Sequence, residues 1–87
     1  TAYSALGDAY AEKNNLKEAV SYYEKASKET KNAILAPRLA FKAAKAYEVL
    51  KDYPKALETF KYVKSEYPSS QEANMVDIYI AKVENQM

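Results

Sequence analysis

The sequence contains no cysteine and no histidine, and only one glycine and three prolines occur among its 87 residues. Without cysteine there are no disulfides, thiolate nucleophiles or cysteine-bound zinc sites, and without histidine the commonest general base and metal ligand is missing. So little glycine and proline is unlike a β-rich or a disordered chain. With 48% hydrophobic and 29% charged residues, the composition predicts a single globular helical domain.

The charge of the chain is balanced, with 13 basic and 12 acidic residues and a net charge of +1. A general nucleic-acid binder carries a clear basic excess, so this class is not expected. Nine tyrosines leave RNA binding by stacked helices as a minor alternative. No apolar run approaches the roughly 18 residues that span a membrane, and no signal-peptide pattern is visible.

Catalysis is not expected from this sequence, and neither is a cofactor or a metal site. The chain has serines but no histidine or cysteine to activate one. A single glycine leaves no glycine-rich phosphate loop. The carboxylates are interspersed with lysines along helical segments, whereas acid–base chemistry needs paired acids in a cleft.

Apolar residues recur at helical spacing along nearly the whole chain, which predicts five helices joined by short turns. Asn15 with Glu18 suits the start of the second helix as a capping box, and Pro37 suits the opening of the third. Asp52 is the expected N-cap of the fourth helix. The segment 69–72 has the sequence Ser-Ser-Gln-Glu, a second capping box that predicts the start of the fifth.

The chain matches itself when it is shifted by 37 residues, so that aromatic meets aromatic and small residue meets small residue. The matched pairs include Tyr10 with Tyr47, Asn15 with Asp52, Ala19 with Ala56, Tyr23 with Phe60, and Ala26 with Val63. Each unit predicts two antiparallel helices. Such a pair cannot cover its own apolar face, so we expect the units to stack, with the aromatics in the core and the small residues where backbones meet.

The repeated unit resembles the tetratricopeptide repeat (TPR). The first copy carries the pattern as Tyr3-x-x-Leu6-Gly7-x-x-Tyr10, followed by Ala19-x-x-x-Tyr23 and Ala26, and the second keeps Tyr47, Ala56, Phe60 and Pro68 but has Ala43-Ala44 for the Leu-Gly pair. The resemblance implies an all-α solenoid of antiparallel helix pairs. The expected boundaries are 1–31 for repeat one, 32–36 for a bridge, 37–68 for repeat two and 69–87 for a C-terminal capping helix.

A second, looser resemblance concerns the segments 51–57 and 66–70, which are similar to those of bacterial cell-envelope TPR proteins. This resemblance implies a scaffold or assembly module in a multiprotein complex. Because the helical pattern begins at once after Thr1, we expect the chain to be a piece of a longer protein. The bacterial envelope or periplasm, with tethering by a missing N-terminal segment, is favoured over the cytoplasm.

Partner binding in TPR proteins usually takes place on the concave face, which the first helix of each repeat lines. Carried over by position, this face includes Ser4, Ala5, Asp8, Ala11 and Glu12 from repeat one and Arg38, Phe41, Lys42, Lys45 and Glu48 from repeat two. The expected partner-binding residues among them are Asp8, Glu12, Arg38, Phe41, Lys42 and Lys45. The three basic residues share one helix face at i, i+4 and i+7, opposite the two acids. We expect a groove that binds an acidic peptide or a C-terminal carboxylate of another protein. The alternative is a solvated face whose opposite charges neutralise one another.

Two further expectations concern the choice of partner. The lysine and asparagine with which chaperone-binding TPR proteins clamp a carboxylate are Ser4 and Asp8 here, so that clamp is not expected. The last helix has a predicted core stripe that leaves Ile78 outside; the stripe consists of Ala73, Met75, Val76, Tyr79, Ile80 and Val83. Ile78 suits either a solvated position or a docking point, and the alternative function is a structural module that stacks with further repeats or a second copy.

Overall fold

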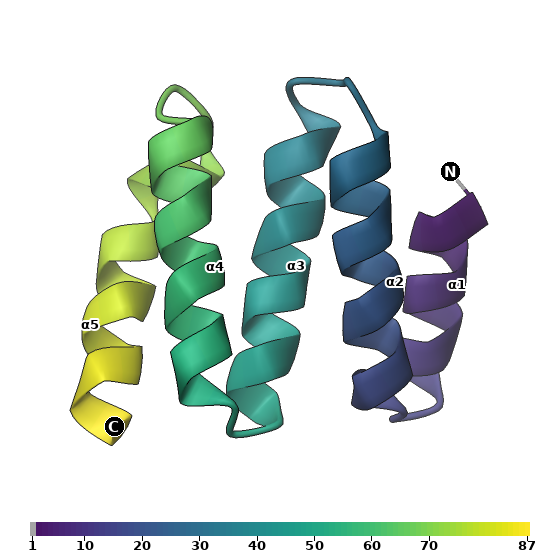
Figure 1. Cartoon of the computed structure of the whole chain (residues 1–87), viewed down its shortest axis with the longest axis horizontal. Helices are drawn as coiled ribbons and strands as arrows, with labels where there is room; N and C mark the ends of the chain where they lie inside the picture. Colours follow the sequence, from purple (N-terminus) through teal and green to yellow (C-terminus); the bar gives the residue numbers. More distant parts are fainter. Residues whose placement is uncertain (1) are drawn as a thin grey trace.

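The structure is a computed structural model that describes residues 2–87. Thr1, the first residue of the expected repeat one, lies outside the described residues. Within this range the chain forms five α-helices, one 3₁₀ helix and no strand (Figure 1). The helices are α1 (Ala2–Glu12), α2 (Leu16–Glu29), α3 (Leu35–Val49), α4 (Tyr53–Glu66) and α5 (Val76–Gln86), with η1 (Glu72–Asn74) before α5.

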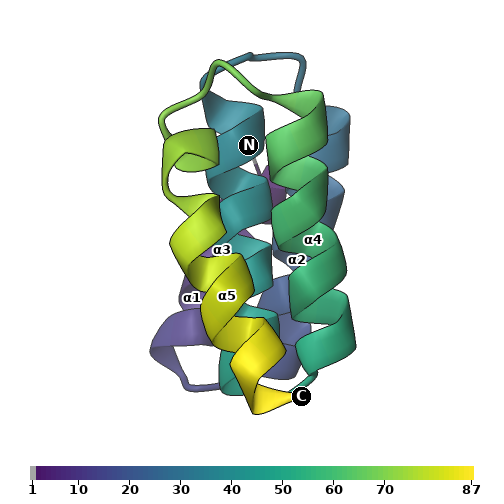
Figure 2. The same ribbon diagram turned by 90° about the vertical axis from the view of Figure 1, so that its left-hand side faces the viewer.

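Consecutive helices run antiparallel and pack against one another in chain order. Seen from the side, α1, α3 and α5 form one layer and α2 and α4 form the other (Figure 2). The molecule is flat, with extents of 32 × 27 × 15 Å. This arrangement confirms the predicted all-α solenoid of helix pairs.

The two hairpin turns share one backbone geometry at the 37-residue offset. Asn14 and Lys51 both have a positive φ, of 60° and 64°. In each turn the residue that follows donates its N–H to a carbonyl near the end of the preceding helix, that of Tyr10 at 2.8 Å or of Tyr47 at 2.9 Å. These are Schellman-type helix ends, so the internal repeat extends to the backbone of the turns.

The helix starts agree only in part with the predicted caps. Asp52 caps α4 as predicted, since its carboxylate accepts a hydrogen bond from the Lys55 N–H at 3.4 Å. Asn15 stands at the N-cap position of α2, but its side chain makes no cap hydrogen bond, so the predicted capping box is wrong. The backbone turn already fixes this entry into the helix.

The start of α3 is set by a residue that the sequence analysis did not single out. The side-chain oxygen of Asn32 accepts hydrogen bonds from the N–H groups of Ile34 and Leu35, both at 2.9 Å. The Asn32 carbonyl accepts a third bond from the Ala36 N–H. The helix therefore begins at Leu35, two residues before Pro37, within the segment expected to be a bridge.

The fifth helix begins later than predicted. The predicted capping box at 69–72 is wrong, because neither η1 nor α5 has a side-chain cap hydrogen bond. The Ser70 hydroxyl accepts a hydrogen bond from the Ala73 N–H at 3.0 Å in the short η1, and α5 starts only at Val76. Because Met75 lies at the junction of the two helices, it is 37% exposed, and its predicted place in the core stripe is wrong. The rest of the α5 stripe packs inward, with Val76 and Val83 buried and Tyr79 and Ile80 partly buried.

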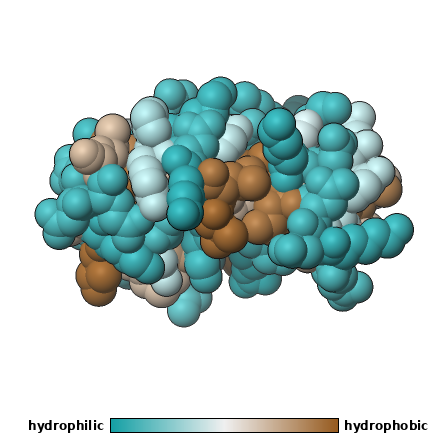
Figure 3. Space-filling view, turned by 90° about the horizontal axis from the view of Figure 1, so that it is seen from below, coloured by the Kyte–Doolittle hydropathy of each residue, from teal (hydrophilic) through white to brown (hydrophobic). Residues whose placement is uncertain are grey.

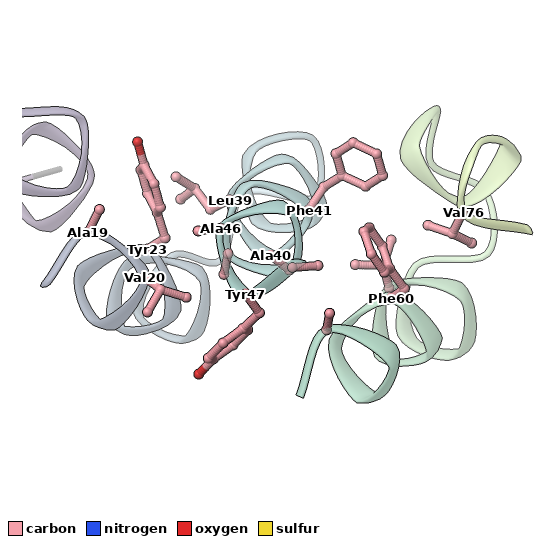
Figure 4. Close-up of a cluster of buried hydrophobic side chains, with 14 of the residues drawn as sticks. Ala19, Val20, Tyr23, Leu39, Ala40, Phe41, Ala46, Tyr47, Phe60 and Val76 are labelled. Atoms are coloured by element: carbon pink, nitrogen blue, oxygen red, sulfur yellow. The ribbon is translucent and has the colours of Figure 1, made fainter. Parts of the chain in front are cut away.

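The core contains the aromatic and small residues that the repeat predicts. Tyr23, Tyr47 and Phe60 are buried between the helices (Figure 4). Gly7 is needed where α1 meets α2, because a Cβ atom at this position would lie 2.7 Å from the Tyr23 ring. Tyr10 is only partly buried, and its ring stacks on that of a neighbouring tyrosine on α2.

Candidate functional site

The first feature of the α1/α3/α5 layer is a hydrogen-bonded carboxylate. Asp8 Oδ1 accepts a hydrogen bond from the Tyr23 hydroxyl at 2.6 Å and another from Lys42 Nζ at 3.2 Å. The Tyr23 bond is the main reason that the pKa of Asp8 lies below its usual value, and burial, followed by this bond, raises the pKa of Tyr23. Asp8 therefore links α1, α2 and α3, and the charge of Lys42 is neutralised here.

The equivalent three positions, 37 residues further along the chain, lie where α3, α4 and α5 meet and carry different side chains. Lys45 stands for Asp8, Phe60 for Tyr23 and Tyr79 for Lys42. The Phe60 and Tyr79 rings stack with centroids 5.3 Å apart, and Phe41 meets both rings edge-on at 5.5 and 5.1 Å. An aromatic cluster from α3, α4 and α5 therefore replaces the polar link.

Lys45 lies above this aromatic cluster. Its ammonium nitrogen is 5.8 Å from the Phe41 ring centroid and 5.9 Å from that of Tyr79, within the range of cation–π attraction. Across residues 2–87, no carboxylate comes within ion-pairing distance of Lys45. Phe41 itself is only 9% exposed, so it supports the surface from below and does not line it.

A pocket of about 390 Å³ opens beside Lys45, between α3 and α5. The exposed Val49 adds an apolar wall. Lys82 Nζ forms an ion pair with Glu48 Oε2 at 3.1 Å, which neutralises both charges and leaves that of Lys45 in excess. Seen from the end of the molecule that lies at the bottom of Figure 1, hydrophobic residues gather near the middle with hydrophilic residues around them (Figure 3).

Arg38 lies apart from this pocket, although it is on the same face of α3. Seven residues separate it from Lys45, about 10 Å along the helix. Arg38 lines a larger pocket of about 590 Å³, formed with the turn that follows α4, where Glu66 and Glu72 are nearby acids and Ile34 is exposed. Glu12 is exposed on α1 and lines none of these pockets.

Comparison with known protein families agrees with this geometry. Two family models, both described as tetratricopeptide repeat, match residues 1–33 and 39–70. The chain belongs to the tetratricopeptide repeat family. Neither a curated protein nor a solved structure shows significant similarity to it.

Membership of the TPR family relates each of the two helix layers to a face of the solenoid. The first helices of the repeats, α1 and α3, line the concave face in this family, and α5 continues their layer. The same layer carries Tyr79 and Lys82 on α5, two residues that were not predicted from the sequence as part of the candidate site. The 37-residue offset from Lys42 to Tyr79 was the signal that could have found Tyr79.

TPR repeats generally mediate protein–protein interaction or scaffolding, and the family is typically non-enzymatic. Between residues 2 and 87, no group of three or more acidic, histidine or cysteine side chains is placed to hold a metal ion. In the same range, no helix is long and apolar enough to cross a membrane.

Proposed function

We propose that this TPR chain binds an acidic segment of a partner protein on its concave face, with Lys45 as the principal contact. The observation that carries the proposal is the Lys45 ammonium, which has no acidic partner and lies over the Phe41 and Tyr79 rings at the edge of a pocket. The ring contacts restrain the side chain, while the N–H donors of the ammonium stay available to a carboxylate.

The contact between Lys45 and one carboxylate is too weak to hold a partner alone. An exposed pair between lysine and a carboxylate contributes at most about 1 kcal/mol, far less than a specific complex needs. An extended segment rises about 3.3 Å per residue, so three residues reach from Lys45 to Arg38. We propose that the segment places its acid at Lys45 and an apolar side chain beside Arg38 and Ile34, where the larger pocket lies.

The proposal is tested by titrating acetylated, fluorescently labelled hexapeptides that carry one or two acidic residues. Lys45→Glu is expected to weaken binding of these peptides by about fivefold or more, because it removes an attraction of up to about 1 kcal/mol and places a carboxylate against a carboxylate. Lys61→Glu makes the same charge change on α4, in the other layer, and serves as the matched control. Equal affinity of wild type and Lys45→Glu would refute the assignment, provided that both proteins unfold at the same temperature.

The proposed cellular location of this interaction rests on the resemblance to bacterial cell-envelope TPR proteins. We propose that the partner belongs to an assembly complex of the bacterial envelope, because segments 51–57 and 66–70 are similar to those of envelope TPR proteins. Fractionation of cells that express the full-length protein tests this point. Recovery with the envelope or periplasmic fraction supports it, and recovery only with the cytosol contradicts it.

Self-association is the second candidate function. Ile78 is 76% exposed on α5, the highest exposure among the large apolar residues with described exposure. Sedimentation at increasing concentration tests this candidate. A mass that rises with concentration and returns to the monomer value in Ile78→Lys supports stacking through α5, and a monomer at every concentration excludes it.

A further inference from the structure

The opposite layer of the molecule carries a second pocket. It lies between α2 and α4, has a volume of about 170 Å³, and has α3 as its floor. In Figure 1, α3 lies between these two helices along their whole length. The lining residues are Glu24, Ser27 and Lys28 from α2, Ala40 and Ala43 from α3, and Glu58, Thr59 and Tyr62 from α4.

The pocket exists because the floor residues are small. Ala40 and Ala43 are buried, with 2% and 0% exposure, so only methyl groups fill the space between α2 and α4 at this level. Ala43 corresponds to Leu6 at the 37-residue offset. A leucine at position 43 would project three more carbon atoms from the floor and fill the space.

The lining of the pocket is negatively charged. Glu24 and Glu58 stand against the single positive charge of Lys28, and neither glutamate forms an ion pair within residues 2–87. Tyr47 points from α3 toward this layer (Figure 4). Burial, followed by a hydrogen bond to the Glu24 carboxylate and then by the charges of Glu24, Asp52 and Glu58, raises the pKa of the Tyr47 hydroxyl.

We propose that this pocket receives one arginine side chain of a partner protein. The apolar floor of Ala40 and Ala43 suits the arginine methylenes, and the two carboxylates suit the guanidinium. Tyr62 is 39% exposed at the wall and offers a ring face on which the planar guanidinium can stack. The volume accommodates a single side chain.

The proposed arginine site is independent of the concave surface, because it uses the other layer of helices and the opposite charge. A chain with both sites holds an acidic segment on the α1/α3/α5 layer and a basic partner on the α2/α4 layer. This is the arrangement that a bridging scaffold needs. The failure of either site would leave the other unaffected.

The experiment is a chemical-shift titration of ¹⁵N-labelled protein with N-acetyl-arginine-methylamide. N-acetyl-norleucine-methylamide, which keeps an aliphatic chain but has no charge, is the matched probe. We expect saturable shifts at residues 24–28, 40–43 and 58–62 with the arginine probe only. Absent shifts, shifts scattered over all acidic residues, or equal shifts with the norleucine probe would overturn the proposal.

Two variants assign the effect to the pocket. Glu58→Gln is expected to weaken binding of the arginine probe by about twofold to fivefold, the effect of one lost ion pair. Glu18→Gln, on an exposed part of α2 outside the pocket, should leave the affinity unchanged. Ala43→Leu should abolish the shifts by filling the pocket. An affinity that stays at the wild-type value in Glu58→Gln contradicts the proposal, even if Ala43→Leu fails to fold.

Discussion

The two hydrogen bonds to Asp8 should contribute very unequally to stability. The Tyr23 hydroxyl belongs to a side chain that is 6% exposed, and it lies 2.6 Å from the carboxylate oxygen. A hydrogen bond of this kind contributes about 1–2 kcal/mol. The side chains of Lys42 and Asp8 are 45% and 54% exposed, so water screens their ion pair and it contributes under about 0.5 kcal/mol.

Two substitutions separate these contributions. Tyr23→Phe removes only the hydroxyl, and the second repeat accommodates Phe60 at the equivalent position. We expect it to lower the free energy of unfolding by about 1 kcal/mol, or the melting temperature by about 4–8 °C for a domain of this size. Lys42→Ala should lower the free energy of unfolding by only a few tenths of a kcal/mol.

Urea unfolding followed by circular dichroism measures both effects. In an Asp8→Asn background the cost of Tyr23→Phe should shrink, because the charged acceptor is already gone, and the double-mutant cycle then gives the coupling between the two groups. A larger loss for Lys42→Ala than for Tyr23→Phe, or additive effects of Asp8→Asn and Tyr23→Phe, would refute this account of the hydrogen-bonded carboxylate.

Three further predictions concern the backbone and pH. Lys51→Gly should raise the free energy of unfolding by about 0.5–1 kcal/mol in the same assay, because a positive φ of 64° strains lysine but not glycine; lower stability would contradict the assigned turn. Gly7→Ala should lower it by about 1 kcal/mol, since the clash with Tyr23 outweighs the gain in helix propensity; a more stable variant would show that the ring can move. The folded pKa values of Tyr23 and Tyr47 lie above their ordinary 10.0, so their contribution is complete below pH 10 and lost as pH rises further. Alkaline titration of unfolding should therefore show a weaker loss in Tyr23→Phe with Tyr47→Phe than in wild type, and identical slopes would contradict the raised pKa values.

The internal repeat made much of the fold predictable. The match at 37 residues placed Tyr23, Tyr47 and Phe60 in the core, and all three are buried. The match also extends to a feature that was not predicted, the positive φ of Asn14 and Lys51. Repeated packing imposes the same side-chain sizes on both units, which is why the pattern survives in the sequence.

Local competition between caps could not be predicted in the same way. Asn15 and Asn32 both precede helices, but only the Asn32 side chain caps one. Before α2, the tight turn already fixes the chain, whereas the longer connection before α3 leaves the cap to a side chain. Met75 became exposed because η1 interrupts the helical period at that point.

The sequence predicted which helix face carries the candidate site, but not which side chains contact its residues. Phe41 belongs by position to the surface of α3, but rings from α4 and α5 surround it. Lys42 and Lys45 look equivalent in the sequence, three residues apart. Both ammonium groups lie over aromatic rings, but across residues 2–87 Lys42 forms an ion pair with Asp8 and Lys45 forms none. Such contacts depend on helices that are distant along the chain.

Binding of an acidic segment at Lys45 is tested most directly by mapping the amide shifts that an acidic peptide causes in the ¹⁵N spectrum of the wild-type chain. We expect the largest shifts to cluster on α3 and α5, around Lys45 and Tyr79. Largest shifts on α2 and α4, or a spectrum that stays unchanged at saturating peptide, would contradict it.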